Sequence, residues 1–303
     1  FQIESRAQMS MLPRMQPRTF YDLVIEVAII RPGPIQGGMI HPYLRRRQGI
    51  DPITYPSADM ETALARTLGV PIFQEQVMQL AMLAAGFSAG EADQLRRAMA
   101  AWKRKGGLEQ FYDRLINGML ARGYERAFAE SIFQQIQGFA EYGFPESHAA
   151  SFALLAYASA WLKCHQPAAF LAALLNSQPM GFYSPSQLVQ DARRHGLSVL
   201  AVDIVHSNWE ATLVIVAAAE PAVRLGLNMV RGLSAEAGWR IEAARAVKHF
   251  HSLQDLALRA QLSTTELQAL AAANTLASLA GHRHEARWHA AVAAPGKGLL
   301  RDA

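Results

Sequence analysis

The sequence predicts a mainly α-helical protein with a short β-containing connector. Apolar residues recur at helical spacing through about the first 175 residues, which indicates a multi-helix domain. Three runs rich in branched residues follow between residues 197 and 230, and such runs are typical of short strands. Helical spacing returns after Gly232 and continues to about Val292. The 303 residues are enough for two compact units, since domains commonly contain ~100–200 residues.

The first domain is predicted to contain a series of amphipathic helices. The first of them ends at RPGP, residues 31–34, because proline and glycine cannot continue the helical hydrogen-bond ladder. In the next helix, Pro71 stands near the first turn, where a proline is tolerated. Ser88 and Glu91 then have the spacing of a capping box at a helix start. The predicted helices cover residues 18–29, 69–85, 88 onward, 108–122 and 127–139.

The stretch EYGFPESHAASFALLAYASAWLKCHQPAAF, residues 141–170, joins a polar loop to an apolar run. Only fourteen residues, 149–162, precede Lys163, whereas a membrane-spanning helix needs ~20 apolar residues. The run therefore predicts a buried helix that holds the polar loop at its tip, and no membrane contact is expected. A small-residue ridge suits close helix packing, and bulky apolar residues surround it. The ridge is Ala149, Ala153, Ala156 and Ala160, and the bulky residues are Leu154, Leu155 and Trp161.

Changes in composition divide the chain into four predicted segments. The turn-rich stretch SQPMGFYSPS, residues 177–186, separates the helical part from the strand-forming runs. The tail APGKGLLRDA, residues 294–303, is typical of a linker. The predicted segments are a helical domain over 1–178, a turn- and β-containing connector over 179–220, a helical module over 221–292 and a linker over 293–303.

The overall composition is that of a folded, mildly basic globular protein. Apolar residues make up 51% of the chain, charged residues 18%, and the net charge is +4. This charge permits a nucleic-acid partner without requiring one. The single cysteine, Cys164, excludes an internal disulfide framework and fits a reducing cytoplasm. The start FQIESRAQM shows no signal sequence and no initiating methionine, so we expect a piece of a longer chain.

The sequence offers no catalytic carboxylate pair and no metal site. Two-metal phosphoryl transfer requires carboxylates that converge on cations ~3.5–4 Å apart, and the chain contains no Asp-x-Asp. The near matches, Asp59 with Glu61 and Glu91 with Asp93, stand at predicted helix starts and are better explained by capping. The histidines of GHRHEARWH, residues 281–289, lack the spacing of metal ligands on a helix face.

Two pairs of adjacent residues, one serine–histidine and one cysteine–histidine, are not expected to form nucleophilic sites. Ser147 and His148 are adjacent in sequence, as are Cys164 and His165. Adjacent residues on a helix do not face one another. We therefore predict no catalytic residue in this chain.

Basic clusters give a stronger signal. Arginine offers phosphates a planar fork and lysine a point charge, although a solvated basic face is an equally good explanation of charge alone. Aromatic residues near the clusters could stack on bases or belong to the core. The clusters are Arg45, Arg46 and Arg47; Arg96 and Arg97; and Lys103, Arg104 and Lys105, and the aromatics are Tyr43, Trp102, Tyr142 and Phe144.

The region LNMVRGLSAEAGWRIEAAR, residues 227–245, has the outline of a helix-hairpin-helix. Gly232 would form the turn, and Ser234 would start the next helix, whose N-terminal N–H groups can bind a phosphate. The usual motif has a second glycine where this chain has Ser234. A plain serine-capped helix remains an equally good explanation of these residues alone. A second, weaker hairpin is predicted through residues 262–281.

Taken together, these stretches resemble a known polymerase family. FQIESRAQM, IRPGPIQGGMIHPYLRRRQG, FQEQVMQLA, ADQLRRAM and EYGFPESHAASFALLAYASAWLKCH look like the fingers domain of the bacterial C-family DNA polymerases, the DNA polymerase III alpha subunits. VRLGLNMVRGLS resembles the helix-hairpin-helix module that follows. The chain is most similar to the damage-induced, error-prone branch, because Pro145-Glu146 stands where replicative enzymes typically carry Asn-Lys.

The resemblance implies binding roles rather than catalysis for this chain. Arg96 and Arg97 match arginines that grip the triphosphate of the incoming nucleotide, and residues of the FPESH loop lie beside the nascent base pair. The family's catalytic aspartates, which hold two Mg²⁺, lie in a palm domain that would precede Phe1, so this chain should not polymerise DNA alone. The implied nucleotide-binding residues are Arg96, Arg97, Tyr142, Ser147 and His148. The implied DNA-binding residues are Arg45, Arg46, Arg47, Lys103, Arg104, Lys105, Gly232 and Ser234.

The implied partners of the whole enzyme are template–primer DNA, deoxynucleoside triphosphates, a sliding clamp and accessory proteins of the mutagenesis cassette. Three alternatives stay open at the level of sequence. The chain could belong to a replicative alpha subunit, to a non-catalytic helix-hairpin-helix scaffold that binds DNA, or to a helical protein-interaction module. Steeply salt-dependent DNA binding would separate the first two from the third.

Overall fold

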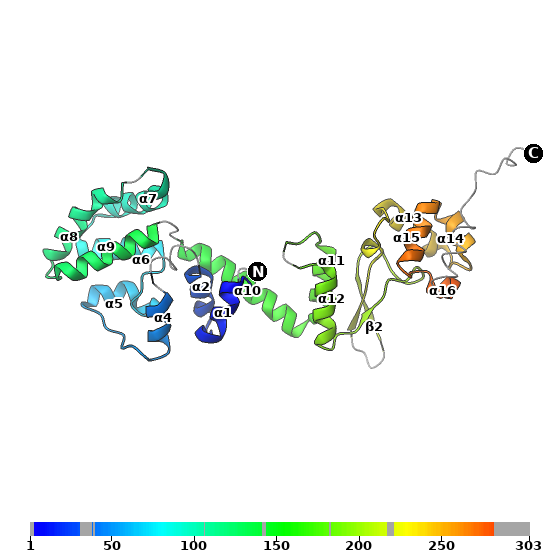
Figure 1. Ribbon diagram of the computed structural model, residues 1–303, viewed down its shortest axis with the longest axis horizontal. Helices are drawn as coiled ribbons and strands as arrows, with labels where there is room; N and C mark the ends of the chain where they lie inside the picture. Colours follow the sequence, from blue (N-terminus) through cyan, green and yellow to red (C-terminus); the bar gives the residue numbers. More distant parts are fainter. Residues whose placement is uncertain are drawn as a thin grey trace, which may run out of the picture. The chain divides into compact units, whose positions relative to one another are not determined.

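The computed structural model describes residues 3–30, 38, 40–105, 107–140, 144–181, 183–216 and 221–281, with only the backbone described at 100–105 and 138–140. The chain separates into two compact units, Phe1–Ser159 and Ala160–Ala303 (Figure 1). The described residues are mainly helical with one small sheet, so the predicted fold class is confirmed. The predicted domain limits at 178, 220 and 292 stay predictions.

The regular secondary structure of the first unit is helical in its described residues, apart from one isolated bridge. Its helices are α1 (Arg6–Met15), α2 (Phe20–Ile29), α4 (Ile40–Arg47), α5 (Ala58–Leu64), η1 (Ala65–Thr67), α6 (Gln74–Ala85), α7 (Ala89–Lys105), η2 (Glu109–Phe111), α8 (Tyr112–Leu120), α9 (Arg126–Ala140) and α10 (Glu146–His165), the last of which continues into the second unit.

Helix α6 lies at the centre of the first unit and packs against α5, α7 and α8. Its apolar residues Val77 and Ala81 are completely buried in the core. The crossing of α6 and α8 is unusually close, because a Cβ atom on Gly118 would lie 2.1 Å from the carbonyl oxygen of Ala85. Arg114, one turn earlier on α8, donates a hydrogen bond of 3.0 Å to the same oxygen. Backbone and side chain of α8 therefore both meet the C-terminal end of α6.

The predicted capping box at the start of α7 is present, whereas α6 starts later than predicted. Ser88 and Glu91 form the predicted capping box, in which the Ser88 amide donates to the Glu91 carboxylate at 2.7 Å. Helix α6 begins at Gln74, so Pro71 precedes the helix instead of lying in its first turn. The physical reason is the side chain of Gln76, which accepts the amides of the two residues after Pro71 and holds them in an extended connection.

Helix α10 is less buried than its composition predicts. Ala149, Ala153 and Ala156 are buried, and the first two belong to the core of the first unit. Ala160 is exposed, and so are the bulky apolar side chains that were expected to surround the helix in the interior, Leu154, Leu155 and Trp161. The prediction of a buried helix is therefore wrong for these residues, because the helix packs against the core only through its other side, where Ala150 and Phe152 are also partly buried. Among the described residues, no helix has the length and apolar character to cross a membrane.

The second unit contains a small sheet followed by short helices. Its elements after α10 are α11 (Pro167–Asn176), α12 (Pro185–Arg194), β1 (Val199–Leu200), β2 (Thr212–Ile215), β3 (Pro221–Arg224), η4 (Leu227–Met229), α13 (Ala235–Val247), α14 (Leu253–Arg259), α15 (Thr264–Ala272) and α16 (Ala277–Ala280). All three predicted strand-forming runs contain a strand of the sheet.

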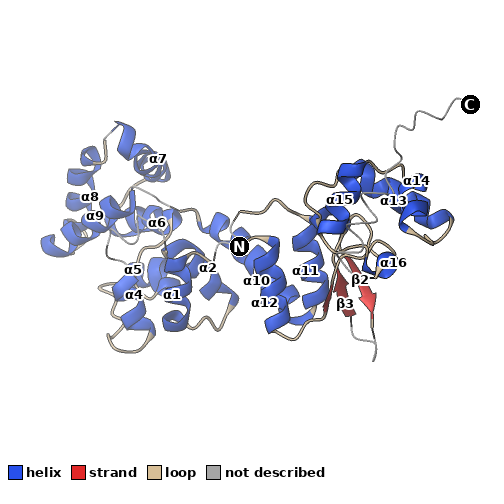
Figure 2. Ribbon diagram, turned by 45° about the vertical axis from the view of Figure 1, so that its right-hand side comes forward, coloured by secondary structure: helices blue, strands red, loops and turns tan. Residues whose placement is uncertain are grey.

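The strand order is β1-β3-β2, with β1 parallel and β2 antiparallel to β3. Figure 2 shows β2 and β3 side by side. Leu171 and Leu175 of α11 pack with Val223 of β3 in a small apolar cluster. The amide of Asn176 pairs with the backbone of Ala211 in both directions, at 2.8 and 3.0 Å. Helix α11 is thereby fixed to the chain immediately before β2.

The last helices of the second unit form a separate core around Ile241, Leu256 and Leu267. The ring of Trp209 lies against Gly238 of α13, where an added Cβ would approach the ring to 2.3 Å. Arg245 donates to the carbonyl oxygens of Ile204 and Ser207, at 2.9 and 2.7 Å. The segment that precedes β2 is thus attached to α13 by both apolar and polar contacts.

A buried carboxyl in α2 makes a prediction about pH. Glu26 is completely buried, and neither of its oxygens has a hydrogen-bond partner. Burial raises the pKa of Glu26 to about 7. The folded carboxyl therefore keeps its proton to a higher pH than the unfolded one, and the free energy of unfolding falls as the pH rises from about 4.5 to about 7.

Relative to Glu26→Gln, the wild-type chain should lose roughly 3 kcal/mol of unfolding free energy between about pH 4 and pH 8. Urea unfolding at a series of pH values measures this difference. Glu109→Gln, a change at an exposed glutamate, serves as the control and should follow the wild type. Parallel pH curves for wild type and Glu26→Gln would contradict the assignment.

Candidate nucleotide-binding site and DNA-binding hairpin

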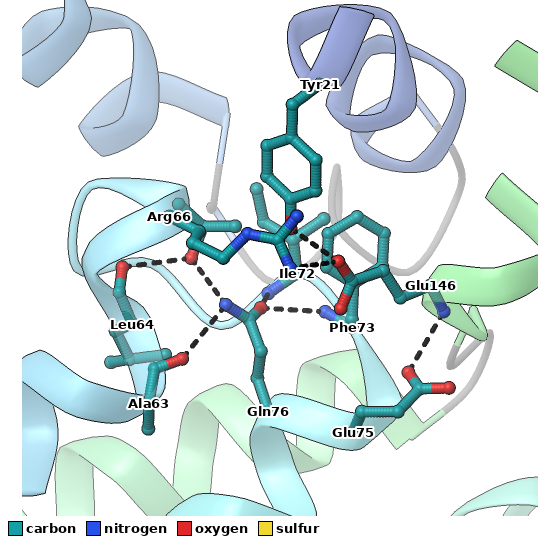
Figure 3. A network of polar contacts seen from close by, with 10 residues as sticks. Tyr21, Ala63, Leu64, Arg66, Ile72, Phe73, Glu75, Gln76 and Glu146 are labelled. Carbon is teal, nitrogen blue, oxygen red and sulfur yellow. Dashed lines mark hydrogen bonds and ion pairs between the residues drawn. The ribbon is translucent and has the colours of Figure 1, made fainter. Parts of the chain in front are cut away.

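The turn that starts α6 is organised by one buried glutamine. The Oε1 atom of Gln76 accepts the amides of Ile72 and Phe73, at 2.8 and 3.1 Å. Its Nε2 group donates to the carbonyl oxygen of Ala63 at 3.2 Å and to the hydroxyl of Thr67 at 2.7 Å (Figure 3). The sequence motif FQEQ thus joins the end of α5 and η1 to the start of α6.

The same motif holds the loop before α10. Phe73 and Phe144 form an isolated parallel bridge, and the Gln74 amide donates to the carbonyl oxygen of Phe144 at 3.2 Å. The amide of Glu146 donates to the Glu75 carboxylate at 3.0 Å. Two stretches about 70 residues apart in sequence, FQEQ and FPESH, are therefore in direct contact.

The Glu146 side chain extends this contact to α2 and η1. Its Oε1 atom accepts from the Tyr21 hydroxyl and from the Arg66 guanidinium, each at 2.8 Å. The Arg66 guanidinium also lies over the Tyr21 ring, 3.8 Å from its centroid. Figure 3 shows Tyr21, Arg66 and Glu146 converging on one point. Glu146, the second residue of the Pro145-Glu146 pair, therefore has contacts with three other parts of the first unit.

Ser147 and His148 follow directly and are exposed. The His148 ring makes edge contacts with Phe144 and Phe152, with centroid distances of 4.6 and 4.4 Å. These contacts orient the imidazole on the first turn of α10. Ser147 and His148 are accessible to a ligand, and Tyr142, the third predicted residue of this loop, lies outside the described residues.

Arg96 and Arg97 share one carboxylate on α7. Arg96 donates to Oδ1 of Asp93 at 2.8 Å, and Arg97 pairs with Oδ2 at 2.7 Å. The hydrogen bond from Arg96 is the main reason that the pKa of Asp93 is lowered. The side chains of Arg96 and Arg97 are 37% and 73% exposed, so both remain accessible. Arg96 and Arg97 thus contact Asp93, whereas His148 contacts Phe144 and Phe152, and the described contacts do not join the two predicted parts of the site.

Asp93 was predicted to act in helix capping, but its carboxylate pairs with Arg96 and Arg97. Its spacing of three and four residues from Arg96 and Arg97 was the available signal, because such residues lie on one face of a helix. Glu91 does act as the capping residue, and hydrogen bonds from Ser88 and Arg114 lower its pKa to about 2. The two acidic residues of the near match therefore have different roles.

The predicted DNA-binding arginines of α4 all have partners in the chain. Arg45 forms a two-pronged pair with Asp51, at 2.7 and 2.6 Å, and is the most exposed of the three. Arg46 donates to the carbonyl oxygen of Leu68 at 2.7 Å. Arg47 pairs with Asp22 at 2.7 Å and also reaches the end of α1, at the carbonyl oxygens of Met15 and Gln16.

For Lys103, Arg104 and Lys105 the structure describes helical backbone at the end of α7, and their side chains lie outside the description, as does that of Trp102. Tyr43 and Phe144 belong to the core. In the described part of the chain, no group of three or more acidic, histidine or cysteine residues could hold a metal ion. The histidines in residues 281–289 lie beyond the described residues.

The helix-hairpin-helix outline is present in the second unit. Gly232 has φ = 89°, a conformation that favours glycine, and Leu233 is buried. Ser234 caps α13, because its hydroxyl accepts the Ala237 amide at 3.2 Å. Arg231 beside the turn is exposed. The exposed N-terminus of α13 thus has the geometry that binds a phosphate.

The range predicted for the second hairpin, residues 262–281, contains α15 and α16, and Asn274 lies between them with φ = 58°. Ser263 starts α15 and forms a capping box with Glu266. Arg240 of α13 donates to the Ala260 carbonyl oxygen at 2.9 Å and pairs with Glu266 at 3.1 Å. This one side chain therefore connects the two hairpins.

Comparisons with known proteins give a family match for the helical first unit and another for the hairpin region of the second unit. Residues 1–123 match the family model described as bacterial DNA polymerase III alpha subunit finger domain, and residues 196–286 match a helix-hairpin-helix motif. The chain belongs to the DNA polymerase III alpha-type family. The predicted resemblance is confirmed.

Relatives in this polymerase family are similar to the whole chain. It is 66% identical to the error-prone DNA polymerase of Bordetella bronchiseptica over 304 residues and 62% identical to that of Pseudomonas aeruginosa over 302, covering 100% of this chain in each case. It is also 62% identical to the error-prone DNA polymerase of Methylococcus capsulatus, over 97% of this chain. The chain spans about 30% of the length of these relatives.

The Gln76 network predicts a large loss of stability on substitution. Gln76→Leu leaves the buried amides of Ile72 and Phe73 without their acceptor, which should lower the free energy of unfolding by about 2–4 kcal/mol. Chemical denaturation measures the change. Gln134→Leu, at an exposed position of α9, is the matched control and should shift stability by less than about 0.5 kcal/mol. Equal effects of the two substitutions would contradict this account.

Proposed function

We propose that the protein containing this chain is an error-prone, DNA-directed DNA polymerase that acts in damage-induced mutagenesis and translesion synthesis. In this proposal, the first unit binds the incoming deoxynucleoside triphosphate and the second binds template–primer DNA. The main support is the pair of accessible arginines, Arg96 and Arg97, on a helix of a fingers domain. A cytoplasmic location accompanies the proposal.

The exposed pairs with Asp93 suit a site that exchanges one anion for another. Surface ion pairs contribute only about 0–1 kcal/mol, so a triphosphate can replace the carboxylate at little energetic cost. Arginine stays protonated and offers two parallel N–H donors to phosphate oxygens. The two side chains would neutralise charge on the triphosphate while a primer 3′-hydroxyl attacks its α-phosphate, the bond between the α- and β-phosphates breaks and pyrophosphate leaves.

Mg²⁺ would neutralise further charge on the triphosphate. Three acidic residues beside the basic clusters have other partners, since Glu91 caps a helix and Asp93 and Asp22 pair with arginines. They do not fit a two-metal site. We therefore place the Mg²⁺ ligands, as catalytic aspartates of a palm domain, in other parts of the polymerase, and assign binding rather than catalysis to this chain.

DNA binding is proposed for the hairpin around Gly232 and Ser234, where the N-terminal amides of α13 would contact a backbone phosphate. Arg231 adds an accessible charge beside this turn. In the first unit, Arg45, Arg46, Arg47, Lys103, Arg104 and Lys105 are proposed to contact DNA. Since Arg46 and Arg47 also bind backbone carbonyl oxygens, their substitution should affect stability as well.

The triphosphate role of Arg96 and Arg97 can be tested in the full-length polymerase. Changing both to alanine should lower kcat/KM for nucleotide incorporation by at least about 100-fold, because two charge-assisted contacts are removed. DNA affinity should change little. Arg126→Ala removes a comparable surface arginine, paired with Glu130, and serves as the control. Normal nucleotide kinetics in the double variant would refute the role.

The DNA role of the hairpin predicts a salt effect. The affinity of the full-length protein for primer–template DNA should fall steeply between about 50 and 200 mM salt. Arg231→Gln should weaken binding for all sequences alike and reduce the salt slope by about 1. Fluorescence anisotropy at several salt concentrations measures both. Arg194→Gln, at the exposed last residue of α12, is the control, and equal slopes for both variants would refute a contact at Arg231.

A further inference from the structure

Glu146 connects the start of α10 to three other elements of the first unit. Its backbone amide is bound to Glu75 of α6, and its carboxylate accepts from Tyr21 of α2 and Arg66 of η1. These three partners lie 71, 125 and 80 residues away in sequence. The first residue of α10 is therefore fixed from three directions (Figure 3).

The two donors to the carboxylate also stabilise each other. The Arg66 guanidinium lies over the Tyr21 ring, while the Tyr21 hydroxyl points to the same carboxylate oxygen as Arg66. Burial, and then the hydrogen bond to Glu146, raises the pKa of Tyr21 above its usual range, which favours the protonated phenol that donates to Glu146. Charge-assisted bonds of this length are stronger than neutral ones.

The fixed residue lies immediately before the exposed ones. Ser147 and His148 extend from the first turn of α10 and share the helix axis with Glu146, so any tilt of that axis at its first residue moves both side chains. Ala149 and Ala153 pack in the core of the first unit and hold the next turns of α10. At the first residue of the helix, the polar contacts are those of Glu146 with Glu75, Tyr21 and Arg66.

We infer that Glu146 is a positioning residue that sets the place of Ser147 and His148 against the body of α2, η1 and α6, and thereby the discrimination between correct and mismatched nucleotides. This inference rests on the proposed polymerase function. The positioning depends on the Glu146 carboxylate, which accepts from Tyr21 and Arg66. A change of charge at Glu146 should therefore be compensated by the opposite change at Arg66.

The test uses the full-length polymerase with four variants: Glu146→Gln, Glu146→Lys, Arg66→Glu and the charge swap that combines the last two. Glu146→Lys places an ammonium against Arg66 and removes the acceptor for Tyr21. Glu146→Gln keeps an acceptor oxygen of the same shape. Glu109→Lys, an identical change of charge at an exposed position of η2, is the matched control.

Two measurements are made on every variant. Hydrogen exchange of the peptide covering residues 144–152 reports on the tip of α10 without requiring activity. Single-nucleotide incorporation with each correct and each mismatched nucleotide gives the ratio of the two kcat/KM values. Glu146→Lys should increase amide exchange of this peptide and change that ratio about 10-fold, Glu146→Gln should have a smaller effect, and the charge swap should restore both readouts toward wild type.

The outcomes separate this inference from the proposed function. If the wild-type protein incorporates no nucleotide, the proposed function fails, and the exchange data still decide whether Glu146 fixes the tip. If Glu146→Lys matches Glu109→Lys in exchange, the anchoring is refuted. If exchange increases while the ratio of kcat/KM values stays that of wild type, Glu146 is structural only and the positioning role is refuted.

Discussion

A buried amide needs partners for both its oxygen and its NH₂ group, and Gln76 finds all of them around the turn that precedes α6. The rest of the candidate site depends on this turn. Because the turn fixes Phe73, it fixes the bridge to Phe144, and because it starts α6, it directs Glu75 to the amide of Glu146. A structural glutamine thus determines where the exposed tip of α10 begins.

The basic residues of this chain fall into two groups that composition alone does not separate. One group donates to backbone carbonyl oxygens and joins elements, as Arg47 does in the first unit and Arg245 in the second. The other group is accessible, and Arg97 and Arg231 are examples. The net charge of +4 therefore does not indicate how many basic residues can bind phosphate, because it also counts the arginines that bind backbone carbonyl oxygens.

Local patterns predicted the local structure well. The capping box of Ser88 and Glu91 and the serine that starts α13 depend on residues three positions apart, which sequence displays directly. The carboxylate contacts of Glu146 could not be predicted, since its partners lie 125 and 80 residues away and follow from the packing of α2 and η1. The burial of α10 was overestimated because apolar composition does not show which faces have neighbours.

The glycine at position 118 has a consequence for how the first unit forms. Glycine is a poor helix former, and it stands in the last turn of α8, a helix of only nine residues. Its missing side chain is what allows the backbones of α6 and α8 to touch. Gly118 therefore lowers the intrinsic helix propensity of α8 but allows its backbone to approach α6 closely. We expect α8 to become helical only together with α6. Secondary and tertiary structure are then acquired in one step at this crossing.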